Sequence, residues 1–350
     1  MLGGQAAGSG PISRCGRIGR FNAIDNVPEA LRNSMNARTS PVDWLLFVLL
    51  GFLWGSSYLF IKIGVEAGLQ PFTLVTSRLL IGFILLATVV AVAREALPRG
   101  TRTYAHLFMM AVFNVALPFS LITWAEQSTD STLAAILNAS VPLFVILIAA
   151  AALADERITP PRVAGLLIGF VGVAILVGFD PGVVAGTNVL AALALIGSSI
   201  SYATGAVYAR RFVHGLRPMI PAVFQVGFAL LISAVLALLF ERPLTIPARF
   251  DAILAVVWLG LLGSGAAYLV FFRLLGRWGA TRTSLVAYLL PVFGIVLGAA
   301  VLQERVDART ILGTALVIGG IALVNLRDRW LPAFARRRAG AAKPAESPRS

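Results

Sequence analysis

Residues 155–176 read DERITPPRVAGLLIGFVGVAIL, and a related stretch, QERVDARTILGTALVIGGIALV, follows at residues 303–324. At an offset of about 148 residues, identical residues fall into register: Glu156 with Glu304, Arg157 with Arg305, Gly165 with Gly313, and Gly172 with Gly320. Matched glycine and charged positions carry more information than the Leu and Val residues between them. A fixed offset of this kind indicates an internal repeat of the fold.

The same register extends toward the N-terminus of each copy. Pro142 in NASVPLF aligns with Pro291 in YLLPVFG. Three further pairs follow in the same order: Trp54 with Tyr202, Pro71 with Pro218, and Arg78 with Gln225. The second copy therefore lacks the tryptophan and the arginine of the first, and we predict that any role of these two residues is not duplicated.

Apolar runs long enough to cross a bilayer recur along the chain. A hydrocarbon core about 30 Å thick requires about 20 apolar residues in a helix. Ten runs reach or approach this length: 44–63, 72–93, 104–124, 131–153, 163–177, 189–209, 220–240, 252–272, 284–302 and 311–325. They lack the two-residue alternation of barrel strands. The sequence predicts an all-α polytopic membrane protein with ten transmembrane helices, five in each copy.

The composition agrees with a membrane protein. Hydrophobic residues make up 58% of the chain and charged residues only 13%, which leaves too little polar material to cover a water-soluble fold. Cys15 is the single cysteine, and the sequence has no His or Cys cluster. We therefore predict no internal disulfide, no metal site and no cofactor.

The positive charges predict the orientation. Ten spans place both termini on one side of the membrane, and 23 of the 29 Lys and Arg residues fall on that side. Five fall on the opposite side, and Arg78 lies inside a span. Because cytoplasmic loops carry the excess of Lys and Arg, both termini are predicted to be cytoplasmic. This placement accounts for the net charge of +13 without a nucleic-acid partner.

The repeat divides the chain into four parts. These are a basic disordered arm at 1–43, a first repeat at 44–178, a second repeat at 188–326, and a basic disordered tail at 327–350. Since each repeat has an odd number of spans, the second must enter the membrane in the opposite sense to the first. Inverted repeats of this kind place a solute site near the midplane and permit alternating access.

The stretch 53–87, LWGSSYLFIKIGVEAGLQPFTLVTSRLLIGFILLA, combines a Trp-Gly-Ser helix with an arginine in the next helix. Together with the repeated Pro, Glu-Arg and Gly positions, it resembles the EamA family of the drug/metabolite transporter superfamily over about residues 44–325. The resemblance implies a ten-helix inverted-repeat exporter or importer of small metabolites in a cell membrane. Its motifs specify the family well and the substrate poorly.

Arg78 is the main candidate for a solute contact. It lies about seven residues inside its span, where a charge costs about 3 kcal/mol or more unless it is hydrated or paired. One interpretation is a contact with an anion or carboxylate in the translocation path. The alternative is a structural arginine that snorkels to the outer interface or pairs with carbonyls at a helix end.

Further polar and aromatic residues lie within the spans and are predicted to line the path. They are Trp54, Asn114, Asn138, Tyr202, Gln225, Tyr268 and Tyr288. Helix packing and interhelical hydrogen bonds are the competing interpretation for all of them. Pro118, Pro142 and Pro291 remove backbone donors inside spans, so they are predicted to be gate elements or fixed kinks.

The remaining repeated residues have structural interpretations. The Glu-Arg pairs at Glu156 and Glu304 lie at short turns, where the acid can cap or meet the dipole of the following helix. Glycines of the matched helices permit close helix approach. These are Gly165, Gly169, Gly172, Gly313, Gly319 and Gly320.

Acidic residues are scarce within the spans. No span carries Asp or Glu near its middle, so the sequence shows no conventional proton relay. Glu126 and Asp130, at the predicted outer mouth, are the nearest candidates for a proton-linked carboxylate. Ordinary solvation in a loop is the simpler interpretation of both.

These observations favour a secondary transporter, in the exporting direction, for small metabolites such as amino acids. A channel or a lipid-handling scaffold is the alternative. An enzyme is disfavoured because the sequence shows no metal cluster, nucleophile motif or buried acid-base pair. The expected partners are a small-molecule substrate and the lipid bilayer of a bacterial inner membrane, and a homodimer is left open.

Overall fold

The computed structural model describes residues 40–153, 159–177, 187–213, 215–244 and 248–323. All regular elements in these ranges are helical. In the first half they are α2 (Pro41–Glu66), α3 (Pro71–Val92), α4 (Thr101–Ala111), η1 (Val112–Ala116), α5 (Leu117–Ala125), α6 (Ser131–Asn138), α7 (Val141–Ala152) and α8 (Pro160–Val177). The second half contains α9 (Thr187–Phe212), α10 (Met219–Phe240), α11 (Phe250–Val257), η2 (Trp258–Ala266), α12 (Ala267–Thr283), η3 (Ser284–Tyr288) and α13 (Leu289–Val301).

Seven helical stretches in the described residues are long and apolar enough to cross a membrane. They are Pro41–Glu66, Pro71–Val92, Thr101–Ala125, Ser131–Ala152, Val189–Phe212, Met219–Phe240 and Phe250–Trp278. Three shorter apolar helices are Arg162–Leu176, Leu285–Val301 and Ala308–Leu323. The predicted all-helical membrane fold is therefore confirmed for the described part of the chain. The count of ten spans stays a prediction.

The first helix begins earlier than the sequence predicts. The Ser40 hydroxyl accepts a hydrogen bond from the Val42 amide, and the Asp43 carboxylate accepts one from the Ser40 amide. This capping box satisfies amide groups that have no partner within the helix. Residues 41–43 are therefore helical and do not belong to the predicted arm. Residues 1–39 of that arm and the whole predicted tail, 327–350, lie outside the described residues.

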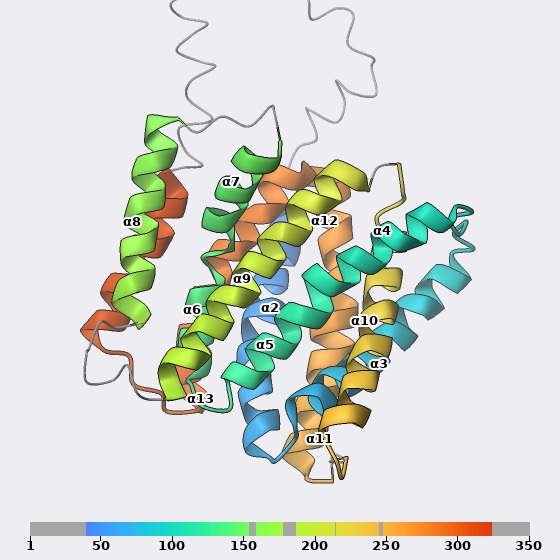
Figure 1. Cartoon of the computed structure of the whole chain (residues 1–350), viewed down its shortest axis with the longest axis horizontal. Helices are drawn as coiled ribbons and strands as arrows, with labels where there is room; N and C mark the ends of the chain where they lie inside the picture. Colours follow the sequence, from blue (N-terminus) through green and yellow to red (C-terminus); the bar gives the residue numbers. More distant parts are fainter. Residues whose placement is uncertain (1–39, 154–158, 178–186, 214, 245–247, 324–350) are drawn as a thin grey trace, which may run out of the picture. The chain divides into compact units, whose positions relative to one another are not determined.

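Glycines join α8 to the helix Ala308–Leu323, which lie side by side in Figure 1. A Cβ atom on Gly172 would lie only 2.7 Å from the carbonyl oxygen of Gly313. A Cβ on Gly320 would lie 2.5 Å from the carbonyl oxygen of Gly165. The predicted close approach is confirmed here because no larger side chain fits between the two backbones. Gly319 is different, since nothing lies within 4 Å of its Cβ position.

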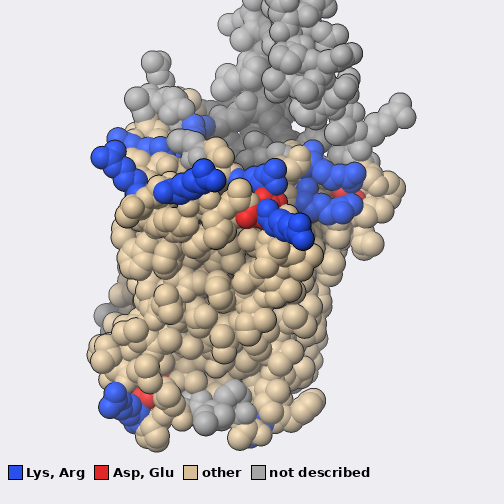
Figure 2. All heavy atoms as spheres, turned by 90° about the vertical axis from the view of Figure 1, so that its right-hand side faces the viewer, with Lys and Arg blue, Asp and Glu red and all other residues tan. Residues whose placement is uncertain are grey.

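The described surface fits a bilayer. Large apolar side chains are exposed on nearly every long helix, among them Leu45, Ile84, Leu167, Leu231 and Val296. On the face shown in Figure 2, Lys and Arg side chains form a belt near one end and are few near the other, and most of the area between them is uncharged. An uncharged zone bounded by charged ends is what a membrane-spanning surface requires.

Helices of the two halves pack against each other in matching pairs. Helix α3, which carries Arg78, packs against α10, which carries the aligned Gln225, as Figure 1 shows. The first helix of one half, α2, packs against α13, and the first helix of the other half, α9, packs against α7. In addition, α3 contacts η2, while α10 contacts η1. The interior of the described bundle is thus built from both halves.

The Glu-Arg turns are described in one half only, because Glu156 and Arg157 lie outside the described residues. Glu304 does not cap the helix that follows it, which corrects the sequence interpretation. Its carboxylate instead accepts hydrogen bonds from the amides of Ser131 and Thr132 at 2.8 and 2.9 Å, and from the Ser131 hydroxyl at 2.8 Å. An acid at the first turn of a helix satisfies free amides, so Glu304 joins the second half to α6.

Candidate functional site

Arg78 lies inside the bundle. Only 3% of the residue is exposed, and its Nε and Nη2 atoms both donate to the Ser264 hydroxyl, at 3.2 and 3.1 Å. The guanidinium carbon lies 4.3 Å from the centre of the Phe119 ring. Among the described residues no carboxylate forms an ion pair with Arg78. These contacts favour an interior arginine over one that snorkels to the interface.

Glycines of the segment η2 (Trp258–Ala266) lie close to Arg78. Ser264 belongs to η2, a π-helical segment, in which a Cβ on Gly260 would lie 2.8 Å from the Arg78 carbonyl oxygen. A Cβ on Gly263 would lie 3.7 Å from Arg78 Nη2. Glycine therefore lets η2 pack directly against the arginine, and π-helical segments occur often at functional sites.

The third long span of the first half contains the other π-helical segment, η1. Its Phe113 carbonyl accepts a hydrogen bond from the Ser201 hydroxyl at 2.8 Å. Asn114, one of the predicted path residues, is half-buried in η1 and faces Gly205 of α9 so closely that no Cβ could fit there. The two π-helical segments thus lie at interfaces between the halves.

Asn138 is the centre of a buried hydrogen-bond network. Its amide nitrogen donates to the Tyr58 hydroxyl at 2.5 Å. The hydroxyl groups of Ser198 and Ser199 both donate to its carbonyl oxygen at 3.3 Å. This network connects α2, α6 and α9, and it satisfies the polar groups that the sequence places within apolar helices.

The other predicted path residues lie at several places. Trp54 is half-buried, with its ring centre 6.3 Å from that of Tyr268 and 5.4 Å from that of Phe271. Tyr202 is half-buried beside the hydrophobic core that includes Tyr58. Gln225 is 6% exposed in α10. Their role in binding stays a prediction.

Charge interactions link several of these side chains. Arg78 interacts electrostatically with four groups: Tyr58, Tyr202, Tyr268 and Glu126. The structure therefore brings one buried cation, three tyrosine hydroxyls and one acid into the same electrostatic environment.

All three predicted prolines follow a departure from regular α-helix. Pro118 is in the first turn of α5, directly after η1. Pro142 is in the first turn of α7, after the break that follows α6. Pro291 comes near the start of α13, after the 3₁₀ segment η3. Local breaks at these positions agree with the missing amide donors, and a gating role stays a prediction.

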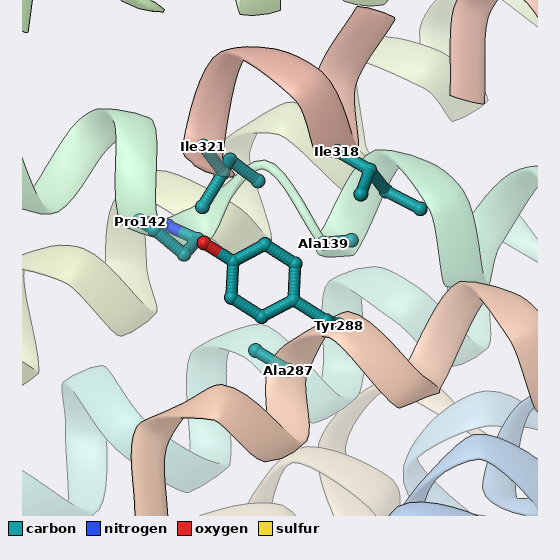
Figure 3. Close-up of a pocket in the computed structure, with 6 residues that line it drawn as sticks. All are labelled: Ala139, Pro142, Ala287, Tyr288, Ile318 and Ile321. Carbon is teal, nitrogen blue, oxygen red and sulfur yellow. The ribbon is translucent and has the colours of Figure 1, made fainter. Parts of the chain in front are cut away.

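A pocket brings Pro142 and Tyr288 together. Figure 3 shows the Tyr288 ring among the six lining residues, with its hydroxyl directed toward Pro142. The lining residues are Ala139, Pro142, Ala287, Tyr288, Ile318 and Ile321. This pocket is mostly apolar, and Arg78 is not among its lining residues.

Sequence reasoning missed three residues that contact or influence the Arg78 site, and it misplaced a fourth, Glu126. Ser264 and Phe119 could not be singled out, because neither residue type is unusual within a span. Tyr58 lies one helical turn after Trp54, and its position in the motif could have been noticed. Glu126 was named as a candidate for a proton-linked carboxylate, with loop solvation as the simpler interpretation, whereas the structure buries it completely. Within the described residues no group of His, Cys, Asp and Glu could hold a metal ion.

Comparisons with known proteins match nearly the whole helical region. The model of the EamA-like transporter family matches residues 43–178 and again residues 189–326. An "Uncharacterized transporter" of Archaeoglobus fulgidus is 28% identical, covering 84% of this chain and 99% of that protein. The "Uncharacterized inner membrane transporter YedA" of Escherichia coli strain K12 is 29% identical, covering 84% and 93%. A solved structure titled "Crystal structure of protein" has a TM-score of 0.59 at 24% identity, covering 84% and 99%.

Proposed function

The chain belongs to the EamA-like transporter family, and from this premise we propose that it is a secondary transporter that exports small metabolites such as amino acids. In this proposal the two halves, 44–178 and 188–326, are inverted repeats of five spans each. They exchange conformations so that a central site opens to each side of the membrane in turn. Both termini are cytoplasmic, and no cofactor takes part.

The pairing of helices between the halves supports this arrangement. An inverted repeat with a two-fold axis requires that each contact between the halves has a counterpart in which the roles are exchanged. The pairs α2 with α13 and α9 with α7 correspond in this way, as do α3 with η2 and α10 with η1. The family model matches each half separately, at residues 43–178 and 189–326, and this also supports a repeat.

The surroundings of Arg78 support an anionic group on the solute. Arginine has five N–H donors in a planar fork. In the structure two of its nitrogen atoms share a single acceptor, the Ser264 hydroxyl, and no acid neutralises the charge among the described residues. A solute carboxylate could accept from the remaining donors. The tyrosine hydroxyls of the same environment suit the polar remainder of an amino acid.

Contacts at both ends of the bundle would have to break in turn. At the end where α3 and α6 begin, Glu304 holds α6, and Glu241 accepts from the amides of Phe72 and Thr73 at 2.7 Å. At the other end, Arg277 donates to the buried Asp43 carboxylate at 2.6 Å. Each contact joins the first half to the second. All of these contacts are formed in the structure, and alternating access requires that one set breaks while the other stays formed.

Exchange of solute across proteoliposomes tests the proposal. Vesicles containing the purified protein are loaded with one unlabelled amino acid at a time, and entry of the labelled compound is followed together with ionic current. Saturable exchange without current is expected for at least one member of the panel. Current without saturation would indicate a channel, and neither signal with any compound of the panel would contradict transport of amino acids.

A further inference from the structure

Glu126 is an acid that the fold buries without a partner. It follows the last residue of α5, and its exposed fraction is 0%. Neither carboxyl oxygen has a hydrogen-bond partner among the described residues. The loop-solvation interpretation is therefore wrong for Glu126. It fits Asp130, four residues later, whose side chain is exposed.

The nearby cation does not neutralise this carboxyl group. Lys62 donates to the main-chain carbonyl oxygens of Glu126 and Thr129 at 3.0 and 2.9 Å, and it lies 3.6 Å from the Glu66 carboxylate. Its ammonium group therefore binds carbonyl oxygens just after α5 and pairs with a different acid, Glu66. The titratable and charged groups that face the Glu126 side chain are Tyr58, Lys62 and Glu66 of α2, Arg78 of α3, and Glu304 beyond α13.

Burial favours the neutral acid over the carboxylate. An ionised carboxylate that is removed from water and left without hydrogen bonds is far more costly than the protonated group. Burial is the largest influence on Glu126, and it raises the pKa of this carboxyl well above its usual range even though Lys62 and Arg78 oppose the shift. The protonated group needs only one acceptor, which a small movement or a water molecule can supply.

A contact between the two halves follows Glu126 closely along the chain, and its acid, Glu304, acts electrostatically on Glu126. Five residues after Glu126, α6 begins with Ser131 and Thr132, whose amides are held by Glu304 of the other half. The Thr132 hydroxyl oxygen is itself buried without a partner, as is that of Thr123, one turn before Glu126. Unpartnered oxygen atoms thus precede and follow the acid along the chain. We call the contact of Glu304 with Ser131 and Thr132 the joint between the halves.

We propose, on the basis of the transport function proposed above, that Glu126 is a proton-binding site controlled by this joint. Glu126 holds one proton while Glu304 is bound to the start of α6. When the joint opens, water reaches the carboxyl group and its O–H bond breaks, so that the proton passes to solvent and a carboxylate remains. Closing the joint reverses the transfer. Opening and closing at this end are therefore linked to proton release and uptake.

Infrared spectroscopy of the purified protein in lipid tests the protonation directly and needs no solute. At about pH 7 ordinary carboxyl groups are ionised. The C=O band of a protonated carboxylic acid at this pH therefore shows that a carboxyl group has kept its proton. The wild-type protein should show this band, and Glu126→Gln should lack it. Glu66→Gln and Asp130→Asn, which alter exposed acids on either side, should keep it. An unchanged band in Glu126→Gln, or a wild type without a protonated acid at this pH, would overturn the proposal.

Exchange into D₂O tests the link to the joint. The same band shifts when its proton is replaced by deuterium, so the rate of the shift measures access of water to Glu126. In Glu304→Gln the rate should rise about tenfold, the factor that corresponds to about 1.4 kcal/mol, close to the lower value for a hydrogen bond to a charged group. Equal rates in both proteins would refute control by Glu304.

These outcomes are separate from the test of transport. A wild-type protein that exchanges no solute but shows the titratable band would refute the proposed function and leave the proton site standing. A protein that exchanges solute but shows no band lost in Glu126→Gln would refute the proton site alone.

Discussion

Replacing Arg78 with Gln, the residue at the equivalent position of the second half, should remove solute binding without unfolding the protein. The two donors to Ser264 share one acceptor at 3.2 and 3.1 Å, a charged hydrogen bond that stabilises by about 1.5–3 kcal/mol. The contact with Phe119 adds up to about 2 kcal/mol. Burying the charge costs about 3 kcal/mol. These terms nearly cancel, so the free energy of unfolding should change by less than about 2 kcal/mol.

Binding should respond differently because a solute carboxylate has no substitute for the guanidinium. Losing one partner of a buried charged pair costs about 2 kcal/mol or more, which is about a 30-fold loss of affinity. Arg78→Lys should lose part of this affinity, since an ammonium group lacks the planar fork. The assay is solute-dependent thermal stabilisation together with exchange in proteoliposomes. A well-folded Arg78→Gln protein with wild-type affinity would refute the assignment of Arg78 to the site.

Three further predictions concern the described contacts. Glu304→Gln removes the charge from three hydrogen bonds and should lower the free energy of unfolding by about 1–3 kcal/mol; denaturant titration checks this, and an unchanged midpoint would contradict it. Asn138→Ala leaves the buried Tyr58 hydroxyl without its donor and should cost about 1–3 kcal/mol in the same titration, whereas a neutral effect would indicate that water replaces the amide. The folded state binds the Glu126 proton more tightly than the unfolded state, since its pKa is raised; stability should therefore fall by about 1.4 kcal/mol per pH unit from about pH 4.3 upward until the folded pKa is reached. Thermal unfolding across pH should show this slope in the wild type and not in Glu126→Gln.

Much of the fold could be predicted because it depends on properties that are local in the sequence. Helical runs follow from apolar length, and the glycines within those runs predicted close helix approach, although not that α8 would pack against the helix Ala308–Leu323. The three prolines predicted breaks that the structure shows. Each of these features needs only a short stretch of chain to be understood.

The contacts of the candidate site depend on long-range packing and were harder to predict. Arg78 was singled out because an interior charge is unusual, but its partner Ser264 lies 186 positions later, in a π-helical segment that no sequence pattern indicated. Glu304 was assigned to its own following helix, whereas the fold brings it to α6. The burial of Glu126 follows from the helices that cover it and from nothing in its immediate neighbourhood.

The central claim, alternating access around Arg78, is tested most directly by labelling a cysteine at its partner. Ser264→Cys, in a Cys15→Ser background, keeps the size of the side chain and is reacted with an impermeant thiol reagent from either side of oriented vesicles. If the two halves alternate, adding Glu304→Gln should raise labelling from the outer side and lower it from the cytoplasmic side. Labelling that rises from both sides together would indicate a continuous pore and would contradict the account.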